Sequence, residues 1–240
     1  MLIATNPYSG EKIDSFPCLS KHDMYARIGE ASAAFADWSD RSFEERAEVL
    51  RAVARQLRAE KHDLAQLMAL EMGKPIREGV PEVEKAAFCA EFYADNAEKF
   101  LTRDTIESDA SLSYVCYQPL GTLLGILPWN APLWLAFRYL APALMAGNTC
   151  VMKHDPHVPQ TAQAIANAFV KAGAPENIMV NLPLETPEVE LAIRDPRIMA
   201  VSFTGSGGAG RKVAEIAGSE IKPCVLELGG SDPSIILADA

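Results

Sequence analysis

Short apolar segments alternate with helix-like stretches throughout the second half of the chain. Strands are predicted at 122–127, 149–152, 178–181, 199–203 and 224–228, and helices at 133–145, 160–171, 187–193 and 208–217. Such alternation is typical of a parallel sheet with helices on both faces. The sequence therefore predicts an α/β, doubly wound fold whose ligands lie at the carboxyl ends of the strands.

The first hundred residues have the apolar spacing of helices. Ser42, with Glu45 three residues later, matches a capping box at the start of one helix. An apolar stripe continues from there to Met68, and Gly73 with Pro75 is expected to end that helix. Two more helices are predicted, at 21–38 and 81–100.

Composition excludes several classes of protein. The formal net charge is −10, which argues against a nucleic-acid or anionic-membrane surface. The five cysteines are widely spaced and match neither a disulfide framework nor a zinc site, as expected in a reduced compartment. No apolar stretch suits a membrane span, and the start of the chain lacks the pattern of a secretory signal. These properties predict a soluble, cytoplasmic protein.

A glycine-rich segment allows two interpretations. Gly205, Gly207 and Gly210 satisfy the G-x-G-x-x-G pattern of dinucleotide sites, and Glu227 then falls near the expected ribose ligand. That pattern ordinarily follows the first strand of its fold, whereas three strand–helix pairs precede it here. The literal fingerprint is therefore the weaker interpretation, and a turn without any ligand is weaker still.

A second motif, Pro-Trp-Asn-Ala-Pro at 128–132, closes one predicted strand and opens a helix. Pro132 falls in the first helical turn, where its missing N–H costs nothing. Asn130 is thereby placed at a strand end, with a side-chain amide that can donate to a ligand. An ordinary helix-capping role for Asn130 is the alternative.

These two motifs, with Glu-Leu-Gly-Gly at 227–230, resemble the aldehyde dehydrogenase superfamily in their order and spacing. The match within the glycine-rich segment is Phe-Thr-Gly-Ser at 203–206, and the resemblance extends from Asn6 to Pro233. It implies oxidation of an aldehyde to a carboxylic acid by NAD or NADP, through a cysteine thiohemiacetal and a thioester. It also implies a homo-oligomer in the full-length parent.

The resemblance assigns roles to individual residues. Asn130 is implied as the amide that donates to the oxyanion of the reacting aldehyde. Glu227 is implied as the general base, and burial beside Gly229 and Gly230 is expected to raise its pKa. The implied cofactor-binding residues are Trp129, Lys153, Gly205, Ser206 and Leu228.

Lys153 matches a family lysine that holds the adenine ribose. Many NAD-preferring members carry glutamate three residues later, where this chain has Pro156. A carboxylate there would repel a 2′-phosphate, so its absence leaves both NAD and NADP open as the cofactor. His154 and His157 are close by, but two histidines without a third ligand are typical of a solvated loop, and no metal site is predicted.

The predicted helix at 133–145 is apolar nearly all round and is expected to be buried. A lone Arg138 in such a helix is costly unless it meets an anion, and Trp134 shares its face. In members resembling succinate-semialdehyde dehydrogenases, an arginine at this offset binds the substrate carboxylate. The implied reaction is therefore succinate semialdehyde to succinate, with Trp134 and Arg138 as substrate-binding residues. A structural salt bridge to a carboxylate of the protein is the alternative for Arg138.

The resemblance also divides the chain into parts. They are an N-terminal helical part of the cofactor domain at 1–110, a protruding oligomerisation strand at 111–118, a Rossmann-like NAD(P)-binding core at 119–231 and the start of a catalytic domain at 232–240. A strand is expected to begin at 233–237. The rest of the catalytic domain is expected to be missing.

The family nucleophile follows in a Gly-Gln-x-Cys segment, which these 240 residues do not contain. None of the five cysteines fits that role, and Cys224, near Glu227, is interpreted as a small core residue. The chain is therefore expected to be inactive alone. Two other classes stay open: a non-catalytic nucleotide-binding remnant, and a structural or interaction protein that keeps only the fold.

Overall fold

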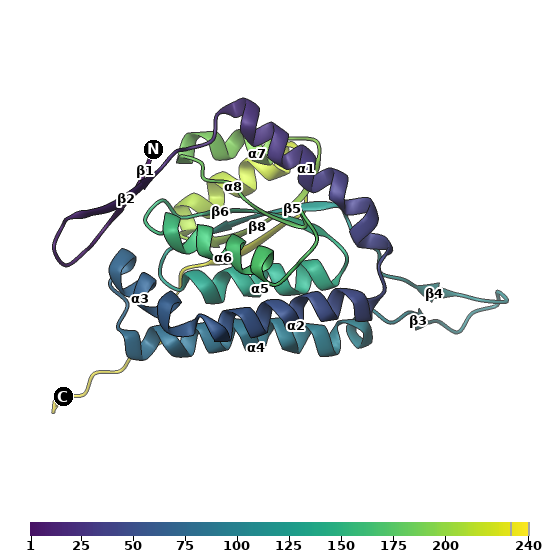
Figure 1. The fold of residues 1–240 in the computed structure, drawn as a ribbon. Coiled ribbons are helices and arrows are strands. Elements are labelled where there is room, and N and C mark those ends of the chain that lie inside the picture. Colours follow the sequence, from purple (N-terminus) through teal and green to yellow (C-terminus); the bar gives the residue numbers. More distant parts are fainter. Residues whose placement is uncertain (231, 240) are drawn as a thin grey trace.

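The computed structural model describes residues 1–230 and 232–239. A five-stranded parallel sheet lies at its centre (Figure 1). The strands follow the order β7 (Met179–Asn181), β6 (Thr149–His154), β5 (Thr122–Leu127), β8 (Ile198–Gly205) and β9 (Cys224–Leu228). The chain builds outward from β5 to β7 and then returns to the other side of β5. This reversal confirms the doubly wound sheet and creates a switch point at the carboxyl ends of β5 and β8.

Helices cover both faces of the sheet (Figure 1). The helices α5 (Pro132–Met145) and α6 (Pro159–Lys171) cover one face, and α1 (Lys21–Asp40), α7 (Val189–Arg194) and α8 (Gly207–Ser219) cover the other. Side chains alternate along β5, so Leu127 joins the first core whereas Leu124 and Ile126 join the second. Burial on both faces explains the nearly continuous apolar sequence of this strand.

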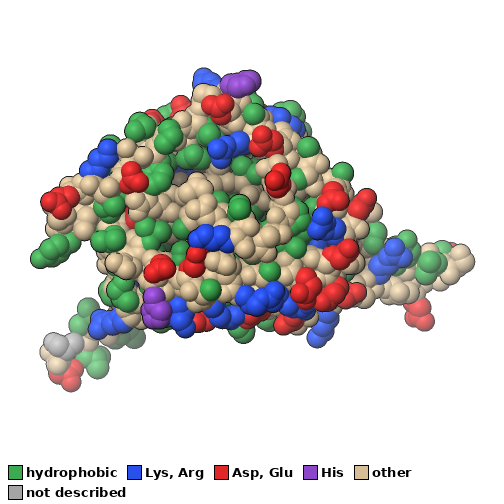
Figure 2. All heavy atoms as spheres, in the orientation of Figure 1, with side chains coloured by type: hydrophobic (Ala, Val, Ile, Leu, Met, Phe, Trp, Pro, Cys, Tyr) green, Lys and Arg blue, Asp and Glu red, His purple; other side chains and the backbone are tan. Residues whose placement is uncertain are grey.

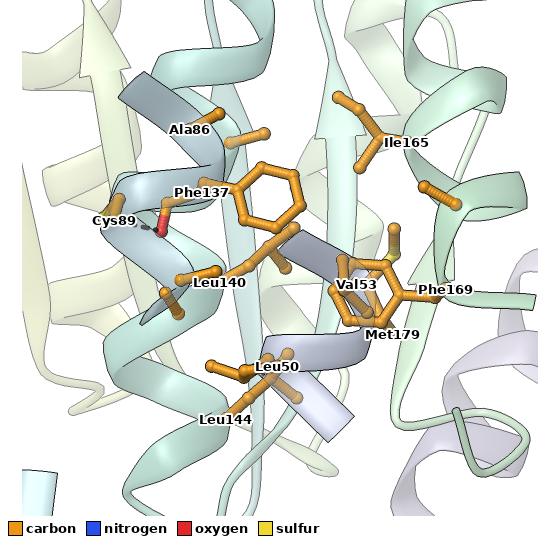
Figure 3. Close-up of a cluster of buried hydrophobic side chains, with 14 of the residues drawn as sticks. Leu50, Val53, Ala86, Cys89, Phe137, Leu140, Leu144, Ile165, Phe169 and Met179 are labelled. Atoms are coloured by element: carbon orange, nitrogen blue, oxygen red, sulfur yellow. Dashed lines mark hydrogen bonds between the residues drawn. The ribbon is translucent and has the colours of Figure 1, made fainter. Parts of the chain in front are cut away.

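Three N-terminal helices form a further layer over α5 and α6. They are α2 (Phe43–Ala59), α3 (Lys61–Met72) and α4 (Ile76–Phe100). Figure 3 shows Val53 of α2 beside Phe169 of α6 and Leu50 of α2 beside Leu144 of α5, in the same cluster as Phe137. The two aromatic rings stack with centroids 6.0 Å apart. Each fully buried side chain of this size contributes about 1.5–3 kcal/mol, so the layer is an integral part of the core.

The outer surface of this layer carries interspersed charges. Figure 2 shows acidic and basic side chains alternating along the border that α2 and α4 form. Arg51 bonds Asp95 at 2.9 Å, and Arg58 contacts Glu84 at 2.9 Å. Exposed pairs of this kind contribute at most about 1 kcal/mol each, so they matter less than the apolar core below them.

The structure corrects the predicted helix boundaries. The single helix expected between Ser42 and Gly73 is two helices, α2 and α3, which meet at Glu60 with φ −104° and ψ 13°. The apolar stripe stays on one side across this break, so its period does not reveal it. The capping box at Ser42 and the stop at Gly73, with φ 77°, are both confirmed. Helix α4 begins at Ile76 rather than at residue 81.

Two hairpins differ from the sequence expectation. The helical pattern predicted for the first hundred residues misses β1 (Leu2–Thr5) and β2 (Lys12–Phe16), which pair antiparallel. The strand predicted at 111–118 narrows to β4 (Tyr114–Val115), whose partner β3 (Asp104–Thr105) is also missed. This second hairpin projects from the body of the molecule (Figure 1).

The prediction of a strand at 233–237 is wrong. These residues are not in a strand, and they extend away from the sheet (Figure 1). A strand requires a neighbour that accepts and donates backbone hydrogen bonds, and the described residues provide none here. Within the same described ranges, no helix combines the length and apolar character needed to cross a bilayer.

The start of α5 is capped by a side chain from α4. Helix α5 has no side-chain cap of its own. Glu82 Oε1 accepts hydrogen bonds from the backbone N–H groups of Leu133 at 2.9 Å and Trp134 at 3.2 Å. The other oxygen, Oε2, is ion-paired with Lys74, whose ammonium also donates to the Asn130 carbonyl at 2.9 Å. This buried network joins the Asn130 loop, the start of α5 and α4.

The end of α5 is tied in the same manner. Trp38 Nε1 donates to the Leu144 carbonyl at 3.1 Å, and Arg46 Nε donates to the Met145 carbonyl at 3.1 Å. Both donors come from the N-terminal helices and satisfy carbonyls that the helix leaves without intrahelical partners. Helix α5 is therefore fixed at both ends by residues distant in sequence.

Replacing the Glu82 carboxylate tests this cap. Glu82→Gln is expected to lower the free energy of unfolding by about 2–4 kcal/mol, because Lys74 loses its buried counter-charge. Glu84→Gln in the same helix is the matched control; Glu84 is 37% exposed, so about 1 kcal/mol or less should be lost. Urea unfolding followed by circular dichroism measures both, and equal losses would contradict the capping role.

Candidate functional site

A cleft of about 590 Å³ opens at the switch point of the sheet. The carboxyl ends of β5, β6 and β8 form one wall, and α7 and α8 form the other. The cleft is lined by Trp129, Lys153, Gly205 and Ser206, all predicted from the sequence to bind a cofactor. Its size and its mixture of apolar walls and few polar groups are typical of a small-molecule site.

Leu228, the fifth predicted cofactor-binding residue, does not line this cleft. Its side chain packs over α8, where a Cβ atom on Gly210 would lie only 2.4 Å from Leu228 Cδ2. Gly210 therefore permits close packing of α8 against β9. Glu227 is also outside the cleft, which removes the ribose-ligand interpretation of that residue.

Lys153 is the buried cation of the cleft. The residue is only 5% exposed, and burial lowers the pKa of its ammonium. The Asp155 carboxylate partly opposes this effect. Within residues 1–230 and 232–239, its ammonium has no hydrogen-bond or ion-pair partner, and its Nζ is not enclosed by protein, because Lys153 lines the cleft. A polar or anionic ligand group in the cleft would supply that partner.

Ser206 begins α8 at the edge of the cleft. Its Oγ accepts a hydrogen bond from the Ala209 N–H at 3.3 Å, so it is the helix N-cap. A Cβ atom on Gly208 would meet nothing within 4 Å, which leaves the backbone there open to approach. The N-terminus of a helix in this position favours a phosphate group.

The far wall of the cleft was not predicted from the sequence. Ile193 of α7 and Val213 and Ile216 of α8 form an apolar part of the cleft lining. The sequence offers no signal that separates these residues from the core, because their spacing is that of any amphipathic helix. The Lys74–Glu82 network was missed for a different reason, since it joins segments far apart in sequence.

A second group of residues lies beside the first turns of α5. Asn130 is exposed, and its side-chain amide makes no hydrogen bond within the part of the chain that the structure describes. The helix N-cap is Ala131, so Asn130 is not the capping residue. Trp134, four residues further on, has the Lys85 ammonium 3.9 Å from its ring centroid. The Asn130 amide is thus free to donate to a ligand.

Arg138 and Glu227 form an ion pair, with Arg138 Nη2 2.6 Å from Glu227 Oε2. The pair joins α5 to β9, and the two side chains are 39% and 52% exposed. The expected burial of Glu227 is wrong, because β9 is the edge strand of the sheet and its outer residues face solvent. The alternative of a salt bridge between Arg138 and a protein carboxylate is the arrangement that the structure shows.

His154 is not the solvated loop residue that the sequence suggests. It ends β6, is buried, and places Nε2 3.1 Å from the Pro132 carbonyl, while Nδ1 accepts from the Asp155 N–H at 3.0 Å. Burial lowers its pKa to about 4. His157 is exposed and contacts Asp155 at 2.6 Å. No cluster of metal-ligating side chains occurs within residues 1–230 and 232–239.

The cysteines differ in their surroundings. Burial raises the pKa of Cys89 to about 11 and that of Cys150 to about 12, and it also raises the pKa of Cys224. Cys18 is half-buried and Cys116 is exposed on β4's hairpin. Nucleophilic cysteines need a lowered pKa, so the buried thiols of Cys89 and Cys150 and the half-buried thiol of Cys224 are poor nucleophiles.

The model of the aldehyde dehydrogenase family matches residues 2–240. The chain therefore belongs to the aldehyde dehydrogenase family, as its motifs predict. Succinate-semialdehyde dehydrogenase [NADP(+)] 1 of Mycobacterium ulcerans is 44% identical over 243 residues, which cover 100% of this chain and 53% of that protein. A probable succinate-semialdehyde dehydrogenase [NADP(+)] of Synechocystis is 43% identical, with the same coverage of both chains.

Solved structures agree with these sequence matches. Succinic semialdehyde dehydrogenase of Streptococcus pyogenes, crystallised in complex with NADP+, matches with a TM-score of 0.93 and 33% identity, covering 97% of this chain and 51% of that one. Succinate-semialdehyde dehydrogenase of Burkholderia pseudomallei has a TM-score of 0.93 and 30% identity, with 98% and 49% coverage. The chain spans about half the length of the relatives it matches.

Acid should destabilise the fold through His154. In the unfolded chain His154 gains a proton below its ordinary pKa of 6.5, whereas in the folded chain it gains one only near pH 4. The neutral, buried His154 therefore stabilises the fold fully above pH 6.5, and this contribution to the free energy of unfolding is lost as the pH falls toward 4. Between about pH 7 and pH 4.5, wild type should lose about 2–3 kcal/mol more stability than His154→Gln, which keeps an N–H for the Pro132 carbonyl. Urea titrations at both pH values measure this, and parallel losses would contradict it.

Proposed function

We propose that this chain is the NADP- or NAD-binding part of an aldehyde dehydrogenase that oxidises succinate semialdehyde to succinate. The cleft between β5, β6 and β8 takes the adenosine and phosphate groups of the nucleotide. Lys153 holds the ribose, and Ser206 with the start of α8 holds the pyrophosphate. The bound nucleotide supplies the hydride acceptor of the reaction.

The observation that carries this proposal is Lys153, a residue only 5% exposed that lines the cleft and whose ammonium has no hydrogen-bond or ion-pair partner in the described residues. By contrast, the Lys74 ammonium beside α5 is paired with the Glu82 carboxylate. A ligand that places a hydroxyl or phosphate oxygen at the carboxyl end of β6 would accept a hydrogen bond from the Lys153 ammonium. The relatives that share the fold include one whose structure contains NADP+.

Pro156 lines the same cleft two residues beyond the end of β6. No carboxylate stands at this position to repel a 2′-phosphate, so NADP is admitted along with NAD. Asp155 also lines the cleft, but its Oδ1 is held by the backbone N–H and ring of His157. The charge balance around the ribose is therefore compatible with either nucleotide.

The substrate proposal depends on the side of α5 that carries Asn130 and Arg138. Asn130 donates its free amide to the aldehyde oxygen as negative charge develops there. Arg138 offers a planar fork of donors that matches a carboxylate, such as the one on succinate semialdehyde. Glu227 acts as the general base. These assignments rest on the family motifs and on the exposure of the three side chains.

A second candidate is a nucleotide-binding protein without turnover. The absence of a Gly-Gln-x-Cys segment in the sequence and the raised pKa values of Cys89, Cys150 and Cys224 favour it for these 240 residues alone. The two candidates share the cleft and differ only in chemistry. Nucleotide binding tests both, and aldehyde oxidation separates them.

Titration calorimetry with NADP+ and NAD+ tests the cleft. Lys153→Met should weaken NADP+ binding about 10- to 100-fold, the equivalent of one charge-assisted hydrogen bond worth about 1.5–3 kcal/mol. Ser206→Ala should weaken it less. Lys171→Met, which removes an exposed lysine of α6, is the control and should leave the affinity unchanged. Unaltered affinity in Lys153→Met would show that the site lies elsewhere.

The same protein, mixed with NADP+ and succinate semialdehyde, should form no NADPH, because these 240 residues contain no Gly-Gln-x-Cys segment to supply the nucleophile. A spectrophotometric assay at high protein concentration measures this. A rate that Glu227→Gln or alkylation of one cysteine abolishes would contradict the expectation and favour the first candidate.

A further inference from the structure

The Arg138–Glu227 ion pair joins two residues that the proposed function uses for different purposes. Arg138 Nη2 lies 2.6 Å from Glu227 Oε2, and both side chains reach solvent. A guanidinium presents one planar fork to a carboxylate. While Glu227 occupies that fork, a carboxylate on a ligand must compete for it.

We propose that Glu227 is an internal competitor for the carboxylate-binding site of Arg138, and that a substrate carboxylate displaces it. This inference rests on the proposed function. A carboxylate-bearing aldehyde would free Glu227 from Arg138 when it binds, whereas an uncharged aldehyde would leave the pair intact. Glu227 would thereby add to substrate selection as well as act as the base.

The solvent exposure of the Arg138–Glu227 pair permits such an exchange. Arg138 and Glu227 are 39% and 52% exposed, whereas Lys74 and Glu82 are 12% and 6% exposed. Exposed ion pairs change an equilibrium by at most about fivefold, so a dissolved carboxylate can compete with Glu227. A buried pair such as Lys74–Glu82 would not open in this way.

The surroundings remain positive once Glu227 leaves. The Lys85 ammonium of α4 lies 3.9 Å from the ring centroid of Trp134. Trp134 itself is one helical turn before Arg138 in α5. The charges of Lys85 and Arg138 both lower the pKa of the Cys89 thiol, against the larger rise that burial causes. A ligand carboxylate that replaces Glu227 would therefore meet Arg138, with Lys85 as a further positive charge in this region.

Calorimetric titration with succinate tests the competition without requiring turnover. Glu227→Gln should bind succinate about two- to fivefold more tightly than wild type, because the competitor is gone. Glu215→Gln removes an exposed carboxylate from α8, on the other face of the sheet, and should bind as wild type does. Succinate binding by Glu227→Gln that is unchanged or weaker would overturn the proposal.

Arg138→Leu separates failure of this inference from failure of the proposed function. If Arg138 holds the ligand carboxylate, Arg138→Leu should lose succinate binding. Wild-type affinity in Arg138→Leu would overturn the proposed substrate site itself. If Arg138→Leu loses succinate binding but Glu227→Gln binds succinate no more tightly than wild type, only the proposed competition by Glu227 would be overturned.

Chemical modification gives a second measurement that does not depend on succinate affinity. Phenylglyoxal attacks free guanidinium groups, and mass spectrometry can follow Arg138 with the exposed Arg211 as an internal reference. Arg138 should react faster relative to Arg211 in Glu227→Gln than in wild type. Equal relative rates would show that Glu227 does not shield Arg138 and would overturn the proposal.

Discussion

The arrangement of the proposed site depends on the carboxylate of Glu82. Helix α5 begins without a side-chain cap of its own, and Glu82 accepts hydrogen bonds from its Leu133 and Trp134 N–H groups. Lys74 balances that charge and holds the Asn130 carbonyl. Asn130 precedes this cap and Arg138 follows it by about one helical turn, so one network orients both of the residues proposed to meet the aldehyde.

A carboxylate from another element also caps the first turn of α6. Glu71 of α3 accepts from the Gln160 N–H at 2.6 Å and from the Thr161 N–H at 2.9 Å, at the start of α6. Burial raises the pKa of Glu71, and these donors oppose that rise. Carboxylates from the N-terminal helices therefore fix the first turns of both helices that cover one face of the sheet. The N-terminal helical part of the chain thus helps to position the helices of the parallel-sheet core.

The sequence predicts the sheet well because each strand is a short apolar run between glycine- or proline-rich turns. Strand β5 has the predicted bounds, and the capping box at Ser42 is a local pattern of three residues. The β1–β2 hairpin was missed because its strands are only four and five residues long, and the β1 sequence Leu-Ile-Ala-Thr does not alternate apolar with polar residues. The break at Glu60 was missed because it does not disturb the apolar stripe.

The candidate site was predictable to the extent that its residues fall in local motifs. Trp129, Lys153, Gly205 and Ser206 share one cleft because parallel strands end at the same edge of the sheet. The cap by Glu82 and the Arg138–Glu227 pair join residues from different elements, which no local spacing encodes. The expected burial of Glu227 failed because a sequence pattern does not show that β9 is the edge strand.

The most direct test of this account is hydrogen exchange at the start of α5. Backbone N–H groups in the first turn of a helix ordinarily lack partners and exchange quickly. NMR exchange on the wild-type chain should instead show Leu133 and Trp134 protected as strongly as Leu124 in the core of β5, with exchange only on global unfolding. Exchange at Leu133 and Trp134 as fast as at the exposed Gly208 would contradict the claim that Glu82 holds the site together.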